Sequence, residues 1–417
     1  MTAAETDRIL DAGQERLLAL ASHLITVDSQ IPPYGDERAI VAELQRLLPE
    51  WGLPAGEVLA PNPERPSLIV RIPGSGGGPT LMLCGHIDTK PVGQARDEWN
   101  SDPLEPVVTD GNLYGLGATD MKGAIAAMIA AVSAIRESGT TLAGDVVLAL
   151  VADEEGGAGE GAQLIAPLIS DVDACLIGEP SGWQYDWQGI HLVSRGVCCF
   201  RVTVSGTQMH SSLSNRLPVV NASEKMAGLL ADMQREFRLD VEPHRLGGVT
   251  PTVNPGVMVS GGTFFGVVPG RAEFACDIRT LPGMTRDDVA AALDAWLDER
   301  RRRDPALDVE YRFEPGLDWI PPAELDADHP LVGAAQRAAE AVLGEAPPLS
   351  VFPGGTDAPW FERAGIPTLP SLGPGMITSA HGPNEHVSVK SLYESAKIYA
   401  RIVLDYCGAA TPEKEGS

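Results

Sequence analysis

Four short runs of uninterrupted apolar residues constrain this 417-residue chain more than any other feature of its sequence. They cover residues 68–70, 81–84, 146–151 and 174–177. A strand that is apolar throughout, rather than at every second residue, is typical of a parallel sheet covered on both faces by helices. A helical pattern at residues 125–135 lies between the second and third runs. The sequence therefore predicts an α/β domain with a mostly parallel sheet, preceded by amphipathic helices around residues 17–24 and 40–48.

The pattern changes after about residue 190, where apolar and polar residues begin to alternate. Residues 200–204 alternate in this way, so one face of that strand is expected to meet water. Further segments follow in the order β-α-β-β-α-β, which is typical of an antiparallel sheet with two helices on one side. The second helix is expected to begin at Thr285, with Asp288 completing its cap. The sequence therefore predicts a smaller α+β domain at residues 191–316, inserted into a larger domain formed by residues 1–190 and 317–417.

Charge and cysteine usage argue against several classes of protein. The chain carries 31 basic and 57 acidic residues, a net charge of −26, so binding to nucleic acid or to anionic membranes is not expected. The N-terminal residues show no signal peptide, and no run of about 18 apolar residues is present to span a membrane. The six cysteines include no CxxC pair, which favours reduced, buried thiols. A cytoplasmic protein is therefore expected.

Histidines and carboxylates stand where the predicted strands end. One further aspartate begins the helix at residues 125–135, and one further histidine follows a glycine-rich turn. Because open parallel sheets bind ligands at the carboxyl ends of their strands, these side chains are expected to converge. Buried carboxylates without partners are costly, and metal coordination offsets that cost for all of them together. The residues are His86, Asp88, Asp120, Glu154, Glu155, Glu179 and His381.

Two imidazoles and three carboxylates suit zinc, cobalt or manganese better than calcium or magnesium. Five ligands fit two divalent ions about 3.5–4 Å apart if one carboxylate bridges them. Such a pair polarises a carbonyl group and lowers the pKa of a water molecule. The water also needs a carboxylate base that is not a ligand, and the adjacent Glu154 and Glu155 can face a water and a metal separately. Asp88 lies two residues from His86 and is placed to hold that imidazole.

At these motifs the chain resembles the M20 family of metallopeptidases, on the branch near acetylornithine deacetylase, succinyl-diaminopimelate desuccinylase and carboxypeptidase G2. The resemblance covers nearly the whole chain. It implies that Asp120 bridges two ions, with His86 and Glu179 on one ion and His381 and Glu155 on the other. Glu154 is then the general base, and the Asp88 carboxylate holds His86. A cis peptide bond between Asp120 and Met121 is also implied. The motifs that carry the resemblance are residues 83–89, 117–123, 152–157, 178–180 and 379–385.

The inserted domain resembles the lid and dimerisation domain of the same family. Residues 205–211 match a motif whose histidine, here His210, reaches the active site of the neighbouring subunit in a homodimer. Arg279 matches an arginine that binds a substrate carboxylate, and Gly355 and Thr356 match a loop that lines the carboxylate pocket. One position departs from the family pattern, because Gly266 stands where the family usually has asparagine.

Three functional hypotheses follow. The first is a metal-dependent amidohydrolase, with Zn²⁺ preferred over Co²⁺ or Mn²⁺, that cleaves the amide bond of an N-acyl amino acid or short peptide next to a free carboxylate. The second is a dipeptidase or carboxypeptidase on the same scaffold. The third is a binding protein that kept the fold without the chemistry, which is disfavoured because Glu154 and every expected ligand are intact. A serine hydrolase is disfavoured because no GxSxG motif is present.

Overall fold

A computed structural model describes residues 2–408, which form two compact units. The first unit comprises the described residues up to Ser194, Glu324–Phe352 and those from Thr356 onward. The second unit comprises Arg195–Ala323 and Pro353–Gly355. The chain therefore passes between the units a few residues beyond the expected boundaries at 190/191 and 316/317.

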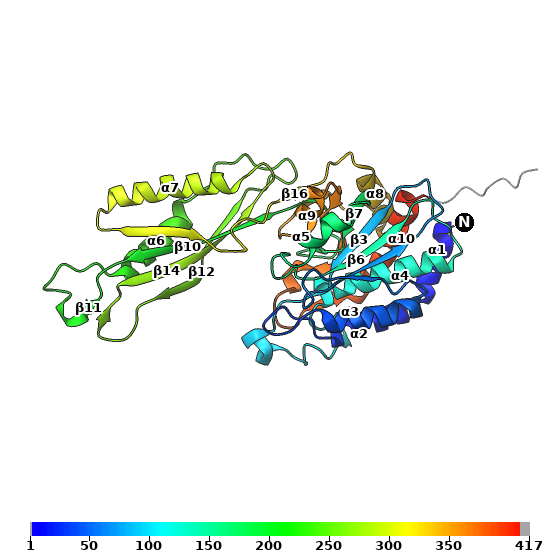
Figure 1. The fold of residues 1–417 in the computed structure, drawn as a ribbon, viewed down its shortest axis with the longest axis horizontal. Coiled ribbons are helices and arrows are strands. Elements are labelled where there is room, and N and C mark those ends of the chain that lie inside the picture. The colour runs from blue at the N-terminus through cyan, green and yellow to red at the C-terminus, as the bar shows by residue number, and fades with distance from the viewer. Residues whose placement is uncertain (1, 409–417) are drawn as a thin grey trace, which may run out of the picture. The chain divides into compact units, whose positions relative to one another are not determined.

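The central sheet of the first unit has six strands in the order β1-β2-β6-β3-β7-β18. Figure 1 labels β6, β3 and β7 of this sheet. All four apolar runs form strands of this sheet, and β6, β3, β7 and β18 are parallel, as expected. The expected direction was wrong for β2, which pairs antiparallel with β6. Apolarity on both faces reflects burial, and burial does not depend on strand direction. The strands are β1 (Glu57–Leu59), β2 (Ser67–Ile72), β3 (Leu81–His86), β6 (Val146–Val151), β7 (Ala174–Ile177) and β18 (Thr368–Leu369).

Helix α4 (Gly123–Glu137) packs on this sheet and is buried along nearly its whole length. Residues 118–137 are long and apolar enough to cross a membrane, but the 18-residue apolar window within them is entirely buried inside the unit, as in the core helix of a folded domain. The sequence predicted α2 (Gln14–Thr26) and α3 (Arg38–Leu47) but not α1 (Thr2–Ala12), which buries Leu10 and little other apolar surface. Helices α1, α2 and α10 (Val389–Tyr406) all contact α4.

Smaller sheets complete the first unit. Strand β9 (Ile190–Ser194) lies between β16 (Ala323–Glu324) and β17 (Leu349–Phe352). The strand at which the chain leaves this unit therefore neighbours the strand by which it returns. The other elements are β4 (Val107–Thr109), β5 (Asn112–Tyr114), β8 (Pro180–Gly182), β19 (Gly373–Met376), β20 (His386–Ser388), α5 (Ala162–Ile165), α8 (Pro330–Leu343) and α9 (Ala358–Arg363).

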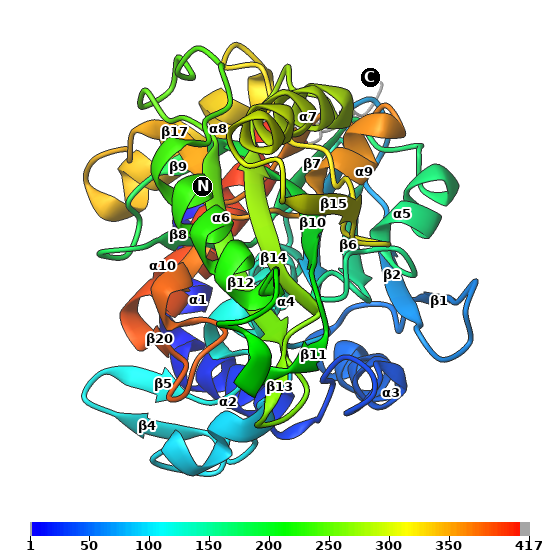
Figure 2. The same cartoon turned by 90° about the vertical axis from the view of Figure 1, so that its left-hand side faces the viewer.

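The second unit contains a four-stranded antiparallel sheet in the order β12-β14-β10-β15 (Figure 2). Its main elements follow the expected β-α-β-β-α-β order, and Thr285 and Asp288 form the expected capping box. Arg300 of the second helix pairs with Glu236 of the first, so the two helices contact each other. The elements are β10 (Gly196–Ser205), α6 (Ala222–Glu236), β12 (Thr252–Gly261), β14 (Arg271–Thr280), α7 (Arg286–Arg303), β15 (Asp308–Phe313), and the short β11 (Met209–His210) and β13 (Val267–Val268).

All six cysteines are free thiols, as expected. Cys199 is half-buried, and the other five are buried. They contribute to packing as small apolar side chains.

Candidate metal centre

The charged residues that follow the central strands lie at one edge of the sheet. His86 is the last residue of β3, Glu154 and Glu155 follow β6, and Glu179 follows β7. Since β3, β6 and β7 are parallel, their carboxyl ends meet at the same edge, as the sequence predicted.

Asp120 and His381 join this cluster from two connecting segments. Asp120 lies in the irregular turn Ala118–Lys122 before α4, and the expected cis peptide bond between Asp120 and Met121 is present. His381 lies in the loop that also contains Glu385. The buried Glu385 carboxylate ties the two segments together, because it accepts 3.0 Å hydrogen bonds from three main-chain N–H groups, those of Gly117, Thr119 and Asp120.

The Asp120 carboxylate lies between the two imidazole rings. Its Oδ1 is 2.9 Å from Nε2 of His86, and its Oδ2 is 3.1 Å from Nε2 of His381. Glu179 Oε1 is 3.5 Å from the same nitrogen of His86, and Glu155 Oε1 is 3.0 Å from that of His381. The five side chains therefore form two groups that share Asp120, which is the division that the family resemblance implied.

Most of these side chains are withdrawn from water. His86, Asp120, Glu155 and Glu179 are at most 7% exposed, whereas the His381 side chain is 48% exposed. Burial raises the pKa of Glu179 well above its usual value, and the charge of Asp120 adds to the effect. Burial also acts to raise the pKa of Asp120, but hydrogen bonds from His381 and His86 outweigh it and lower that pKa. So dense a group of buried carboxylates requires positive charge close by.

Two overlapping sets of donors are close enough together to hold a metal ion. His86, Asp120 and Glu155 offer ligand atoms within 4.8 Å of one another, and so do His86, Glu154 and Glu179. Imidazole nitrogens combined with carboxylate oxygens are the donors that zinc and its neighbours prefer. Because Asp120 presents one oxygen to each imidazole, the residues fit a pair of divalent ions that share a carboxylate.

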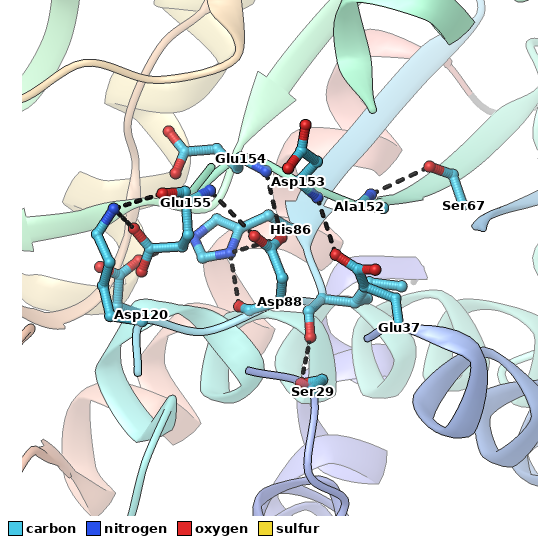
Figure 3. Close-up of polar contacts among 12 residues, drawn as sticks. Ser29, Glu37, Ser67, His86, Asp88, Asp120, Ala152, Asp153, Glu154 and Glu155 are labelled. Atoms are coloured by element: carbon cyan, nitrogen blue, oxygen red, sulfur yellow. Dashed lines mark hydrogen bonds and ion pairs between the residues drawn. The ribbon is translucent and has the colours of Figure 1, made fainter. Parts of the chain in front are cut away.

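The half-buried Glu154 differs from its neighbour Glu155. Its carboxylate makes no hydrogen bond in the part of the chain that the structure describes, and Figure 3 shows it directed away from Asp88. Burial raises the pKa of Glu154 to about 7, with the charges of Glu155 and Asp120 adding to the effect and that of His86 opposing it. A carboxylate with this pKa is suited to accept a proton near neutral pH.

Asp88 contacts the centre through both its main chain and its side chain. The Nδ1 of His86 donates to the main-chain carbonyl oxygen of Asp88 at 3.0 Å, whereas the nearest Asp88 carboxylate oxygen is 3.7 Å away. The carboxylate instead accepts the main-chain N–H groups of Glu154 and Glu155, at 3.3 and 3.0 Å. The sequence predicted that Asp88 holds His86, but it identified the wrong acceptor atom and missed the second contact.

Lys90 is a residue of the centre that the sequence analysis missed. Its Nζ donates to the main-chain oxygen of Glu155 at 2.5 Å and lies 3.0 Å from Oε2 of the same residue. The other oxygen, Oε1, faces His381. The signal for Lys90 was its place two residues beyond Asp88, directly after the first histidine motif.

The second unit holds His210. This histidine is exposed at the end of β11, and its Nδ1 accepts the main-chain N–H of Ser212 at 3.2 Å. Strand β11, which contains His210, pairs with β13. The next residue, Ser211, donates its N–H to the carbonyl oxygen of Gly266. Gly266 has a φ of 82°, a conformation that glycine and asparagine adopt more readily than other residues. The departure from the family pattern at this position therefore keeps the backbone conformation accessible.

Arg279 and Gly355 also belong to the second unit. Arg279 is partly exposed and pairs with Asp277 at 2.9 Å. Its neighbour Arg195 was not singled out from the sequence; its Nε is buried without a hydrogen-bond partner in the described chain. Burial lowers the pKa of Arg195, and the nearby charge of Arg279 lowers it further. Gly354 accepts the main-chain N–H of Arg195 at 2.8 Å, so the loop before Gly355 lies beside the main chain of Arg195.

Thr356 belongs to the first unit. It is buried, and its hydroxyl accepts the main-chain N–H of Ala358 at the start of α9. This contact stabilises the helix terminus, and the expected contact of Thr356 with a substrate carboxylate stays a prediction.

Residues 82–405 match the sequence model of peptidase family M20/M25/M40. The match includes every residue of the candidate metal centre and most of the chain. The chain belongs to this family. The resemblance inferred from the motifs is thereby confirmed, and so is the conclusion that the protein is an enzyme of the hydrolase class.

Two curated relatives cover almost all of this M20 chain. It is 28% identical to an N-formyl-4-amino-5-aminomethyl-2-methylpyrimidine deformylase of Bacillus subtilis, over 94% of this chain and 95% of the relative. It is 32% identical to a succinyl-diaminopimelate desuccinylase of Gluconacetobacter diazotrophicus, over 92% of this chain and 95% of the relative. By name, one relative removes a formyl group and the other a succinyl group.

Solved structures share the fold of this M20 chain at lower identity. The di-peptidase Dug1p of Saccharomyces cerevisiae has a TM-score of 0.78 and 18% identity, with 99% of this chain and 100% of that chain covered. A dinuclear metal binding M20 peptidase of Bacillus subtilis has a TM-score of 0.62 and 20% identity, with 94% and 98% covered. These likenesses confirm the expected fold class, an α/β domain with an inserted α+β domain.

Proposed function

We propose that this M20 protein is a two-metal amidohydrolase that removes an acyl group from the nitrogen of a carboxylate-bearing substrate such as an N-acyl amino acid. The observation that carries the proposal is the Asp120 carboxylate, whose two oxygens each face a different imidazole beside a further carboxylate. The names of the two relatives, which specify removal of a formyl and a succinyl group, favour a deacylase over a dipeptidase or carboxypeptidase.

Two divalent ions are part of the proposal. His86, Asp120 and Glu179 would hold one ion, and His381, Asp120 and Glu155 the other. We assign Zn²⁺, with Co²⁺ or Mn²⁺ as substitutes, because imidazole and carboxylate donors occur together here. When bound, the ions polarise the scissile carbonyl group and make a water molecule more acidic.

The side chains around the ions do the proton work. Glu154 accepts a proton from water at its unpaired carboxylate and returns it to the leaving nitrogen. Burial favours the protonated form of Glu154, and the bound ions would oppose that shift. Asp88 keeps the main chain of Glu154 in place, and Lys90 restrains Glu155 through one oxygen so that the other stays directed at His381.

Substrate recognition is assigned to the arginines of the second unit. Arg195 has no carboxylate partner among the described residues, and Arg279 has one, so the pair carries surplus positive charge on an otherwise acidic protein. Two adjacent guanidinium groups are the usual means of binding a carboxylate through paired hydrogen bonds. Arg195, Arg279 and the loop at Gly355 are therefore proposed to bind the free carboxylate of the substrate, and Thr356, the next residue in the chain, is proposed to take part.

A homodimer formed through the second unit is also proposed, with His210 supplied to the partner's active site. Its support is β12, an edge strand of the four-stranded sheet. Val257, Met258 and Val259 on this strand are each more than half exposed, and Phe264 and Phe265 are 77% and 93% exposed. Exposed edge strands and apolar patches of this kind are usually covered by another chain. A cytoplasmic location is proposed from the free thiols, and the expected lack of binding to nucleic acid and membranes stays a prediction.

The proposal is tested by hydrolysis of a matched substrate panel. N-formyl, N-acetyl and N-succinyl derivatives of several amino acids are compared with dipeptides, using protein loaded with Zn²⁺ or Co²⁺. The expected result is a kcat/KM for at least one N-acyl amino acid that exceeds that of every dipeptide by tenfold or more (about 1.4 kcal/mol). Preference for dipeptides would instead establish the peptidase alternative.

A further inference from the structure

A network of buried charges lies behind the turn that carries Glu154 and Glu155. Arg65 binds Glu37 through two hydrogen bonds, from Nε to Oε2 at 2.7 Å and from Nη2 to Oε1 at 2.5 Å. The Nη1 of Arg65 is 2.7 Å from Oδ1 of Asp153. The main-chain N–H of Asp153 donates to Glu37 at 3.2 Å (Figure 3). One arginine therefore joins the start of α3, the segment before β2 and the turn after β6.

All three members of the network are buried. Glu37 is fully buried, and Arg65 and Asp153 are 7% and 6% exposed. Buried charges depend on their partners, because water cannot replace a lost contact. Loss of the Arg65 charge would leave two carboxylates close together without a cation, and the turn would have to move to relieve them.

The backbone of Asp153 shows why the turn needs support. Asp153 has a φ of 63°, in the left-handed region that residues other than glycine seldom adopt. Its Oδ2 accepts the N–H of Glu160 at 2.8 Å, which closes the turn. A side chain at Gly156 would come within 2.2 Å of Asp153 Oδ1, so glycine there leaves room for the contact with Arg65. The Asp153 carboxylate thus fixes an uncommon backbone conformation directly before Glu154.

The turn is held from two directions. On one side Asp88 accepts the N–H groups of Glu154 and Glu155, and on the other Arg65 and Glu37 hold Asp153. We propose that Arg65 and Glu37 are positioning residues of the reaction, which fix this turn so that Glu154 reaches the water and Glu155 its ligand position. This inference rests on the proposed function for the roles of Glu154 and Glu155. A displacement of about 1 Å in such a group costs roughly a hundredfold in rate.

The matched control is Arg401, which pairs with Asp7 in the same unit. This ion pair joins α10 to α1, and neither helix carries a residue of the metal centre. Arg401→Met therefore removes an arginine from an ion pair between elements without affecting the turn. Arg65→Met removes both the charge and the planar guanidinium group. Arg65→Lys keeps the charge but loses the guanidinium group that contacts two carboxylates.

Two measurements test the proposal on metal-saturated protein and on apoprotein. In steady-state kinetics with saturating metal, Arg65→Met is expected to lower kcat about a hundredfold with KM changed less than threefold, Arg65→Lys to recover part of that loss, and Arg401→Met to match the wild type. In hydrogen exchange of the apoprotein, the amides of residues 153–160 are expected to exchange about tenfold faster in Arg65→Met, while those of Val146–Val151 stay protected.

Unchanged exchange of residues 153–160 in folded Arg65→Met would overturn the proposal, as would a kcat equal to that of Arg401→Met. If Arg65→Met does not fold, Glu37→Gln and Arg65→Lys take its place. The decrease in kcat and the faster exchange of residues 153–160 are then expected to be smaller. The exchange measurement requires no turnover, so it separates the two ideas. If Glu154→Gln proves fully active, the proposed function fails, while faster exchange in the Arg65 variant would still establish that the network holds the turn.

Discussion

The metal centre of the first unit and the candidate residues of the second unit lie in different environments. In the first unit, the imidazoles and carboxylates are mostly buried and contact one another, so their relation is fixed within one rigid core. In the second unit, His210 is exposed and Arg195 has no carboxylate partner among the described residues. The side chains of the metal centre contact one another, as expected for groups that together hold metal ions. His210 and Arg195 of the second unit are instead available to contact a substrate or a partner subunit.

Metal removal should have the largest effect. Chelation is expected to reduce hydrolysis below detection, because the two histidines and three carboxylates would then neutralise only one another. Activity should return on addition of Zn²⁺, and elemental analysis should find up to two ions per chain. Full activity in protein shown by that analysis to be metal-free would contradict the two-metal assignment.

Glu154→Gln should lower kcat about 10²–10⁴-fold while both ions remain bound. The amide has nearly the size of the carboxylate, but it cannot accept the proton. Metal content is measured beside the kinetics, because Glu154 also lies close enough to His86 and Glu179 to bind an ion. A loss of metal together with activity would make Glu154 a ligand and move the base role to another residue.

His210→Ala tests whether His210 of one subunit acts at the active site of the other subunit in a homodimer. Loss of one donor to the developing oxyanion is expected to lower kcat about 10²–10³-fold. Mixing His210→Ala with Glu154→Ala under conditions of subunit exchange should restore activity, because one site of each mixed dimer then has both groups. A mixture that stays inactive although exchange is demonstrated, or a protein that is a monomer at working concentration, would disprove the shared site.

Arg195→Ala and Arg279→Ala should each lower kcat/KM about 10–100-fold for a substrate with a free carboxylate, since each removes a charged hydrogen-bond donor. The same substrate with its carboxylate amidated is the control. In the wild type, amidation should carry a large penalty, and in the variants little further loss should follow. Equal penalties in the wild type and in both variants would remove the arginines from this role.

The smallest predicted effect is a change in stability at Glu362 of α9, which lies outside the metal centre. The Glu362 carboxylate has one buried oxygen without a hydrogen-bond partner among the described residues. Burial raises the pKa of Glu362 to about 7. A main-chain hydrogen bond from Glu324 opposes this shift, and the charge of Glu324 adds to it. The protonated form is thus favoured in the folded state, so its contribution to stability is complete below about pH 4.5 and is lost as the pH rises through 7.

Glu362→Gln keeps a neutral side chain at every pH. Thermal unfolding should therefore show little difference from the wild type at pH 5, and a more stable variant at pH 8.5 by about 1 kcal/mol. A stability difference between the two proteins that does not change with pH would refute the assignment.

The convergence of three residues of the centre could be predicted because they lie within four residues of a strand end. His86, Glu155 and Glu179 follow apolar runs whose carboxyl ends must meet, so their convergence required no knowledge of tertiary contacts. Arg65 and Glu37 lie far from every motif and meet Asp153 only through folding, so no local pattern marked them. The direction of β2 was also wrong, because burial on both faces occurs in either orientation.

The neighbouring positions of β9 and β16 bear on how substrate range can change in such a protein. The chain leaves the first unit at Ser194 and returns at Glu324, on strands that share one small sheet. A segment that enters and leaves through adjacent strands can be lengthened, shortened or exchanged without interrupting the host sheet. Two of the residues proposed for recognition, Arg195 and Arg279, lie within this segment, whereas all five proposed metal ligands lie outside it. A protein engineer can therefore graft the segment of one relative onto the core of another, and change the substrate range while leaving the metal ligands untouched.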